Sequence, residues 1–227
     1  MRRALSVFLP LLAVLALATW RARGPEPKPA TAPPREFSAA RAMDVLRATL
    51  AEQTPHPVAS PANARVRDRI VARFRDLGYP ANVHRTFACN AHAVCANVDN
   101  ILAGAPNAAV LLVAHYDSVG AGPGASDDGM GIATLLEIAR AIRGERFHNS
   151  VAFLVDDGEE AGLLGAEGFV AQGGAPRIVI NVENRGTYGL SNMFETSRGN
   201  RWLVRHLARA LERPQGSSLF YAIYNLL

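Results

Sequence analysis

Hydrophobic and polar positions alternate in blocks along the second half of the chain. Short, continuous apolar runs predict buried strands, and longer segments with apolar residues three or four apart predict helices. The strands are predicted at 109–114, 151–155 and 177–183, and the helices at 129–143, 163–172 and 200–213. This alternation predicts an α/β fold with a mixed, mostly parallel central sheet and helices on both faces.

The first half of the chain predicts two helices and then two extended segments. Ser38 can cap a helix that runs to about residue 52, and Ser60 followed by Pro61 marks the start of a second helix that ends at Gly78. The extended segments fall near 82–88 and 97–103. With 227 residues, 49% of them hydrophobic, the chain can bury one sizeable core but is short for a second full domain.

The N-terminal residues are typical of a segment that targets a chain to a membrane. Residues 4–20 carry no charge and follow two arginines. This length lies at the short end for a membrane span and also suits a signal peptide, with Ala16-Leu17-Ala18 resembling a cleavage site. We therefore expect residues 1–23 to be a membrane anchor or a signal peptide, and the Pro-rich residues 24–36 to be a stiff linker.

Both alternatives predict export of the remaining chain, residues 37–227. An uncleaved segment would leave this domain membrane-anchored on the extracytoplasmic side, in the periplasm or outside the cell, and a cleaved one would release it as a secreted protein. In an exported protein, Cys89 and Cys95 favour a small disulfide loop. A metal site that includes His92 and a pair of free thiols are the alternatives.

The basic charge is confined to the N-terminal flank. The whole chain has a formal net charge of +4, whereas residues 1–35 alone hold six basic residues and one acid, which leaves the rest slightly acidic. The main body has no basic cluster interleaved with aromatic residues, so we do not expect nucleic acid as a partner. The main body also lacks a long apolar stripe, so the sequence does not indicate where an oligomeric interface would lie.

Polar residues follow each of the three predicted strands. His115 and Asp117 come after the first strand, four carboxylates at 156–160 follow the second, and Glu183 ends the third. Ligands of open α/β sheets bind outside the carboxyl ends of the strands, so these side chains should converge at one edge. A glycine-rich loop, residues 119–131, can bring Asp127 and Asp128 to the same edge.

Each of these residues has an ordinary structural explanation when it is taken alone. Asp128 can cap the next helix, and Asp156 and Asp157 can shape a turn. Together, however, the carboxylates repel one another and need a cation, and imidazole with carboxylates suits Zn²⁺, with Mn²⁺ or Co²⁺ as alternatives. Of the adjacent Glu159 and Glu160, one can bind metal while the other acts as a general base, and spacing alone does not say which.

Three ordered motifs resemble those of the co-catalytic di-zinc aminopeptidases, the family of the bacterial leucyl aminopeptidases. The motifs are HYDSVGAGPGASDDGMG, FLVDDGEEAGLLGAEGF and INVENRGTYG with MFETS, and the resemblance runs over residues 95–227. It is strongest to the membrane-attached branch, which includes endoplasmic reticulum metallopeptidase and fungal vacuolar membrane protease. The implied fold is the α/β/α sandwich of zinc exopeptidases.

The resemblance assigns a role to each matching position. His115, Asp127, Glu160 and Glu183 match metal ligands, with Asp127 bridging two zinc ions and followed by a cis peptide bond. Asp117 matches the acid that orients His115, and Glu159 matches the general base. The implied reaction is removal of the N-terminal residue from a peptide or protein substrate.

The chain departs from this family near its C-terminus. The family has a further His on the second zinc, whereas only His206 lies downstream of Glu183, within a predicted helix. We therefore expect a peptidase domain that is incomplete at the C-terminus. The alternatives are a non-catalytic or truncated ectodomain that binds a partner, as in the transferrin-receptor and nicalin branches, and a glutaminyl cyclase-type acyltransferase.

Overall fold

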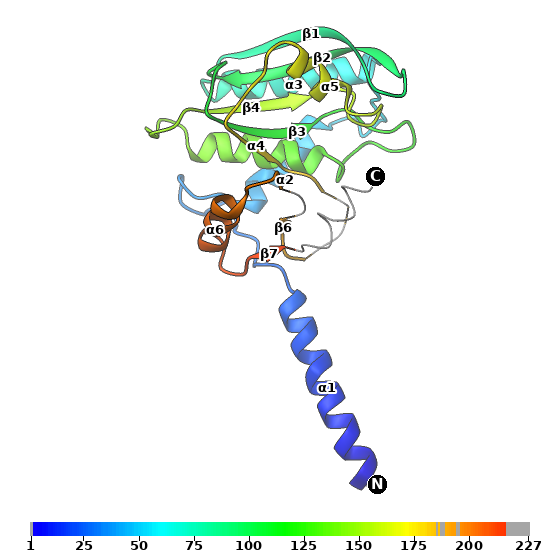
Figure 1. Cartoon of the computed structure of the whole chain (residues 1–227), viewed down its shortest axis with the longest axis vertical. Helices are drawn as coiled ribbons and strands as arrows, with labels where there is room; N and C mark the ends of the chain where they lie inside the picture. The colour runs from blue at the N-terminus through cyan, green and yellow to red at the C-terminus, as the bar shows by residue number, and fades with distance from the viewer. Residues whose placement is uncertain (1, 185, 187–188, 194–195, 217–227) are drawn as a thin grey trace. The chain divides into compact units, whose positions relative to one another are not determined.

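The computed structural model describes residues 2–184, 186, 189–193 and 196–216 (Figure 1). The chain divides into two compact units. Residues 27–186 form the larger unit, which contains the central sheet and all the predicted site residues. Residues 1–26 and 187–227 form the smaller unit.

The larger unit is built on a five-stranded mixed sheet with the order β1-β2-β4-β3-β5. β3 is flanked by β4 and β5, and both pairs are parallel, whereas β1 with β2 and β2 with β4 are antiparallel. The strands are β1 (Ala81–Cys89), β2 (Cys95–Gly104), β3 (Val110–His115), β4 (Val151–Asp156) and β5 (Ile178–Asn181). The mixed α/β fold predicted from the sequence is confirmed.

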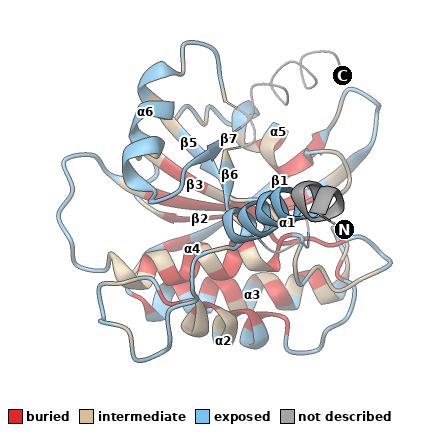
Figure 2. Ribbon diagram, turned by 90° about the horizontal axis from the view of Figure 1, so that it is seen from below, coloured by how far each residue is buried: buried red, intermediate tan, exposed pale blue. Residues whose placement is uncertain are grey.

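Helices cover both faces of this sheet. Figure 2 shows α2 (Ala39–Thr49), α3 (Pro61–Asp76) and α4 (Gly129–Ala141) gathered on one side. Their apolar residues pack with Ile101 and Ala103, while the intervening Leu102 belongs to a separate cluster, as the two-residue period of a strand requires. α5 (Leu164–Ala171) contacts β1 and β2, and its Phe169 packs with the cluster that holds Leu102.

The helices begin at the residues that the sequence marks as caps. The Ser38 hydroxyl accepts a hydrogen bond from the N–H of Arg41, and the Ser60 hydroxyl accepts one from the N–H of Asn63. The Asp128 carboxylate does the same for α4 by accepting the N–H of Gly131. Each cap satisfies a backbone donor that has no partner within its helix.

The second half of the expected linker is held against the sheet domain. The guanidinium of Arg41 donates to the carbonyls of Ala30 and Ala32 at 2.6 and 2.8 Å, and Arg140 donates to the carbonyl of Glu36 at 2.9 Å. Both arginines also bind the carboxylate of Glu137, which is 1% exposed. We call residues 27–36 the N-terminal strap, because this ordered segment is part of the larger unit.

Cys89 and Cys95 form a disulfide. Cys89 ends β1, Cys95 begins β2, and the two residues pair with each other, so the bond closes the turn of this hairpin. The turn inside it holds Asn90, whose side-chain amide donates to the carbonyls of Ala161 and Gly162, both at 3.3 Å. The predicted disulfide is therefore confirmed, and its hairpin contacts the segment between β4 and α5.

The smaller unit contains the N-terminal helix α1. No helix in the described part of the chain is both long and apolar enough to cross a membrane. The described elements of this unit are α1 (Arg2–Ala22), β6 (Asn192–Met193), α6 (Arg201–Ala210) and β7 (Gln215–Gly216).

Candidate metal centre

The site is centred on His115, the last residue of β3. Because β3 lies between β4 and β5, the carboxyl ends of three parallel strands meet at this point. The imidazole is 2% exposed, and its Nε2 faces carboxylates from three other segments of the chain. The convergence expected from the order of strands and polar residues is therefore present in the structure.

Three carboxylates approach Nε2 of His115. The nearest oxygen is Oδ1 of Asp127, at 2.9 Å. Oε1 of Glu183, two residues after β5, lies at 3.8 Å, and Oε2 of Glu159 lies at 3.9 Å. The structure thus brings together three of the acids that the sequence analysis selects, and the Asp127–Asp128 bond is cis, as the resemblance implies.

Asp117 lies on the other side of the imidazole. Its Oδ1 is 3.4 Å from Nδ1 of His115, and its side chain is 1% exposed. The same carboxylate accepts the backbone N–H of Glu159 at 3.0 Å and that of Glu160 at 3.1 Å. Asp117 therefore connects the loop after β3 to the loop after β4.

Glu160 is linked to this group through its backbone N–H, which donates to Asp117. Burial and the like charge of Asp127 raise the pKa of its carboxyl group. Burial also raises the pKa of Glu159, and the like charges of Glu183 and Asp117 act in the same direction. These two glutamates therefore share a crowded acidic site, in which a positive charge would relieve the repulsion.

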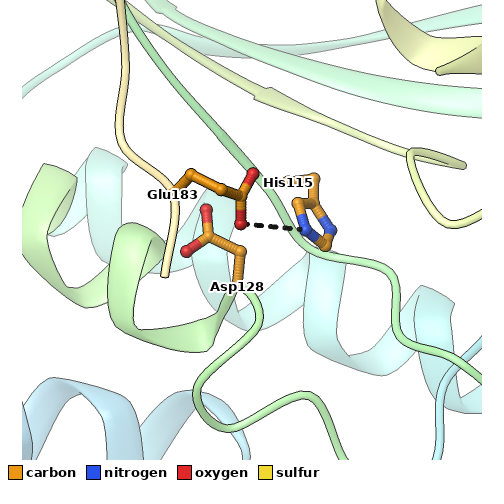
Figure 3. A group of neighbouring side chains, drawn as sticks. All are labelled: His115, Asp128 and Glu183. Atoms are coloured by element: carbon orange, nitrogen blue, oxygen red, sulfur yellow. Dashed lines mark ion pairs between the residues drawn. The ribbon is translucent and has the colours of Figure 1, made fainter. Parts of the chain in front are cut away.

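The structure adds Asp128 to the residues that could hold a metal. His115, Asp128 and Glu183 each offer one ligand atom, and these atoms lie within 4.8 Å of one another. Figure 3 shows the three side chains pointing toward one another from separate segments. The sequence analysis brings Asp128 to this edge and gives it the role of a helix cap, and its Oδ1 does cap α4.

The second oxygen of Asp128 is the clearest sign that a group fits here. Among the described residues, Oδ2 of Asp128 is the one buried side-chain oxygen or nitrogen that has no hydrogen-bond partner. Burial and the like charge of Glu183 raise the pKa of Asp128 to about 9. A buried carboxylate is costly unless it is paired, so this oxygen, the nearby carboxylates and the imidazole fit a divalent cation.

His115 compensates part of this negative charge. Burial opposes its protonation, but the hydrogen bonds to Asp117 and Glu183 outweigh burial and raise the pKa of His115 to about 12. In turn, burial would raise the pKa of Glu183, but the hydrogen bond to His115 holds it below its ordinary value. A proton and a metal ion would compete for Nε2 of His115, because a metal binds only the unprotonated nitrogen.

The remaining acids of the cluster after β4 face the interior. Asp156 is 4% exposed, and burial raises its pKa to about 7. Asp157 is 1% exposed, and its carboxylate accepts hydrogen bonds from the Asn63 side chain and from the N–H of Asp99. Asp157 therefore supports the loop after β4 through these hydrogen bonds, as the structural alternative for this residue predicts.

His206 lies in α6, in the smaller unit. It is exposed, and its Nδ1 lies 2.7 Å from the carbonyl oxygen of Trp202, one helical turn earlier. Parts of the third sequence motif, at 185, 187–188 and 194–195, and the C-terminal stretch 217–227 fall outside the described residues.

A comparison with known protein families identifies the family of this chain. The model of peptidase family M28 matches residues 97–225, more than half of the sequence. The chain belongs to peptidase family M28. The match covers every site residue named above, which all lie between 115 and 183.

The M28 chain is also similar to an endoplasmic reticulum metallopeptidase and to a vacuolar membrane protease. It is 35% identical over 121 residues to endoplasmic reticulum metallopeptidase 1 of Homo sapiens, across 51% of this chain and 13% of that protein. It is 29% identical over 209 residues to the vacuolar membrane protease of Schizosaccharomyces pombe, across 84% of this chain and 24% of that protein. The M28 chain therefore spans about a quarter or less of these relatives.

Solved structures share the fold of the M28 chain. A Zn-dependent exopeptidase from Parabacteroides distasonis aligns with a TM-score of 0.64 and 19% identity, across 80% of this chain and 77% of that one. A glutaminyl cyclase from Porphyromonas gingivalis aligns with a TM-score of 0.64 and 21% identity, across 80% of this chain and 76% of that one. Both confirm the central sheet flanked by helices.

Proposed function

We propose that this M28 domain is a zinc-dependent aminopeptidase, which hydrolyses the first peptide bond of peptide or protein substrates. The observation that carries the proposal is the group of carboxylates around His115, whose oxygens lie 2.9–3.9 Å from Nε2. The unpartnered oxygen of Asp128 adds a second reason to expect a cation. One imidazole with several carboxylates is a ligand set that suits Zn²⁺.

The proposed ligands are His115, Asp127, Glu160 and Glu183, and two zinc ions would occupy a complete site. Zinc supplies Lewis-acid polarisation of the scissile carbonyl and lowers the pKa of water. Asp117 faces the imidazole ring of His115 and orients it. The same carboxylate fixes the backbone of Glu159 and Glu160 by accepting hydrogen bonds from their N–H groups. This acid therefore positions the site without entering the reaction.

Glu159 is the proposed general base. Its carboxylate lies within 4 Å of His115, and burial raises its pKa toward the range in which a base both accepts and returns protons at neutral pH. Glu159 takes a proton from the attacking water and later delivers it to the amine of the departing peptide. The peptide bond breaks, and its nitrogen leaves as a neutral amine.

The test uses Glu159→Gln, which keeps the shape of the side chain but cannot accept the proton. Hydrolysis of a panel of aminoacyl-anilides should fall by about 10²–10⁴-fold, while the zinc content by elemental mass spectrometry stays at the wild-type level. Glu167→Gln, an exposed glutamate on α5, is the matched control and should keep full activity. Chelation should abolish wild-type turnover, and added zinc should restore it.

Two outcomes would contradict the aminopeptidase proposal. A wild-type protein that binds zinc but hydrolyses no anilide would favour a non-catalytic domain that binds a partner. Formation of pyroglutamate from peptides with N-terminal Gln would instead indicate an acyltransferase of the glutaminyl cyclase type.

We also propose that the domain acts at a membrane, on the extracytoplasmic side. The support is the uncharged N-terminal segment and the similarity to proteases whose names place them in the endoplasmic reticulum and at the vacuolar membrane. The disulfide is consistent with an oxidising compartment.

A further inference from the structure

We propose that residues 54–63, the segment that leads into α3, position the two loops that carry the proposed ligands and the general base. The proposal rests on the proposed function for its kinetic consequences, and on hydrogen bonds and packing for its structural ones. Within the segment, Asn63 is the principal positioning residue and His56 the second. Neither is among the residues that the family resemblance selects.

The segment makes a pair of hydrogen bonds with the loop after β3. The backbone N–H of His56 donates to the hydroxyl of Ser118 at 2.8 Å, and the N–H of Ser118 donates to the carbonyl of His56 at 3.3 Å. Ser118 follows Asp117 directly, and both His56 and Ser118 are at most 2% exposed. This pair fixes the chain immediately after the acid that orients His115.

His56 also supports the glycine-rich loop. Gly124 has a φ of +61°, and a Cβ atom built there would lie 3.7 Å from Cε1 of the His56 ring and 2.9 Å from the carbonyl oxygen of Asp127. The imidazole therefore lies beneath the turn that delivers Asp127 to the site. Its Nδ1 lies 3.0 Å from the carbonyl of Thr54, which holds the ring in place.

The same segment contacts the loop after β4. The side-chain amide of Asn63 donates to Oδ1 of Asp157 at 2.9 Å and reaches the carbonyl of His56 at 3.5 Å. Asn63 is 3% exposed and Asp157 is 1% exposed. A single amide therefore links the segment to the residue that lies two positions before Glu159.

Packing reinforces this hydrogen bond. Gly158, between Asp157 and Glu159, has a φ of +71°, and a Cβ atom built there would lie 3.4 Å from Cγ2 of Val58. Val58 packs with the small buried cluster that includes Val98 and Leu164. The backbone next to the general base is thus enclosed between the 54–63 segment and the sheet.

Together, these contacts fix the position of the loop after β3 relative to the loop after β4. Asp117 joins the two loops on the side of the site, through the N–H groups of Glu159 and Glu160. The 54–63 segment joins the same loops from beneath, through Ser118 and Asp157. A base that is misplaced by about 1 Å can cost on the order of 10²-fold in rate, so the segment should affect turnover more than substrate binding.

The first test is Asn63→Ala, which removes the donor to Asp157. We expect kcat to fall by roughly 10–100-fold, with KM changed less than about twofold and zinc content unchanged. Hydrogen exchange measured by mass spectrometry should become faster in peptides that cover 157–163. Ile70→Val, at a fully buried position of the same helix, is the control for a general loss of stability and should change neither kcat nor this exchange.

A second variant separates positioning from a general structural role. Asn63→Asp places two carboxylates together and should impair turnover as Asn63→Ala does. Adding Asp157→Asn restores the hydrogen bond between positions 63 and 157 with donor and acceptor exchanged, while the longer contact with the carbonyl of His56 stays lost. The amide introduced at position 157 can still accept the N–H of Asp99 through its carbonyl. We expect the double variant to recover most of the lost kcat and slow exchange.

The outcomes distinguish this inference from the proposed function. Wild-type kcat and exchange in Asn63→Ala, an equal loss in Ile70→Val, or an absence of rescue in the double variant would overturn the positioning role. If the wild-type protein shows no turnover, the proposed function fails, and the exchange of residues 157–163 alone decides the role of Asn63.

Discussion

Single side chains in this site serve two loops at once. The carboxylate of Asp117 faces Nδ1 of His115 and also accepts the N–H groups of Glu159 and Glu160. A carboxylate can accept from both glutamates because it has two equivalent oxygens, whereas an amide has one oxygen and an NH₂ group. The chemical identity of this residue therefore matters as much as its shape.

Asp117→Asn should lower both stability and zinc affinity. One of the two glutamate N–H groups would lose its acceptor, at a cost of about 1–3 kcal/mol in the free energy of unfolding. The orientation of His115 would also loosen, which typically reduces metal affinity by 10–100-fold. Urea unfolding and a zinc titration against a chelating indicator measure the two effects. Asp76→Asn, at the exposed end of α3, is the control, and unchanged zinc affinity in Asp117→Asn would remove Asp117 from its positioning role.

At the scale of elements, the β1–β2 hairpin is held by a charged cross-strand pair. Arg85 and Asp99 are paired in the register, and Nε of Arg85 donates to Oδ1 of Asp99 at 2.7 Å. Arg67 of α3 binds the other oxygen of Asp99. The Arg85 guanidinium is the main reason that the pKa of Asp99 lies below its ordinary value.

Arg85→Ala should change how stability depends on pH. A carboxyl group with a lowered folded-state pKa stabilises the fold above its ordinary pKa of about 4, and this stability is lost as pH falls through the lowered value. Because the Arg85 side chain is exposed and solvent screens the pair, we expect the variant to melt at most about 2–4 °C below the wild type at pH 6, and the gap to close toward pH 2.

The control for this experiment is Arg73→Ala, which removes the same charge from an exposed position of α3. Differential scanning calorimetry at several pH values provides the melting temperatures. A gap in Arg85→Ala that is as large at pH 2 as at pH 6 would show that the Arg85 side chain acts through packing and not through the charge of Asp99.

The fold was more predictable from the sequence than the contacts that hold the site. Strands and helices have local periods, and the order of strands with polar ends predicts that His115, Asp127 and Glu183 converge. The bond between Asn63 and Asp157 joins residues 94 positions apart, and that between Ser38 and Glu137 joins residues 99 apart. Such partners leave no periodic signal, because only the tertiary fold determines which polar groups meet.

At the scale of the whole molecule, the N-terminal strap extends the folded domain toward the N-terminus. Glu137 on α4 binds Arg41, Arg140 and the N–H of Ser38. The arginines use their remaining donors for carbonyls of the strap. Burial would raise the pKa of Glu137, but its arginine partners hold the pKa below the ordinary value.

A chain that begins at Phe37 should be less stable than one that begins at Pro27. Without the strap, Arg41 and Arg140 keep their ion pairs with Glu137 but lose the backbone carbonyls that accept their other hydrogen bonds. At about 1 kcal/mol for each hydrogen bond, we expect the free energy of unfolding to fall by about 2–4 kcal/mol. Urea unfolding of the two shortened chains measures the difference, and coincident midpoints would show that the strap is only passively associated.

The strap also determines where this protein can be cut. Poorly ordered chain ends and exposed loops are the preferred sites of proteolytic cleavage, because a protease needs several residues of free backbone. Here the carbonyls of Ala30, Ala32, Pro34 and Glu36 accept hydrogen bonds from Arg41 and Arg140. We therefore expect residues 30–36 to resist limited proteolysis for as long as these hydrogen bonds hold, although the segment is rich in proline and lies outside the sheet.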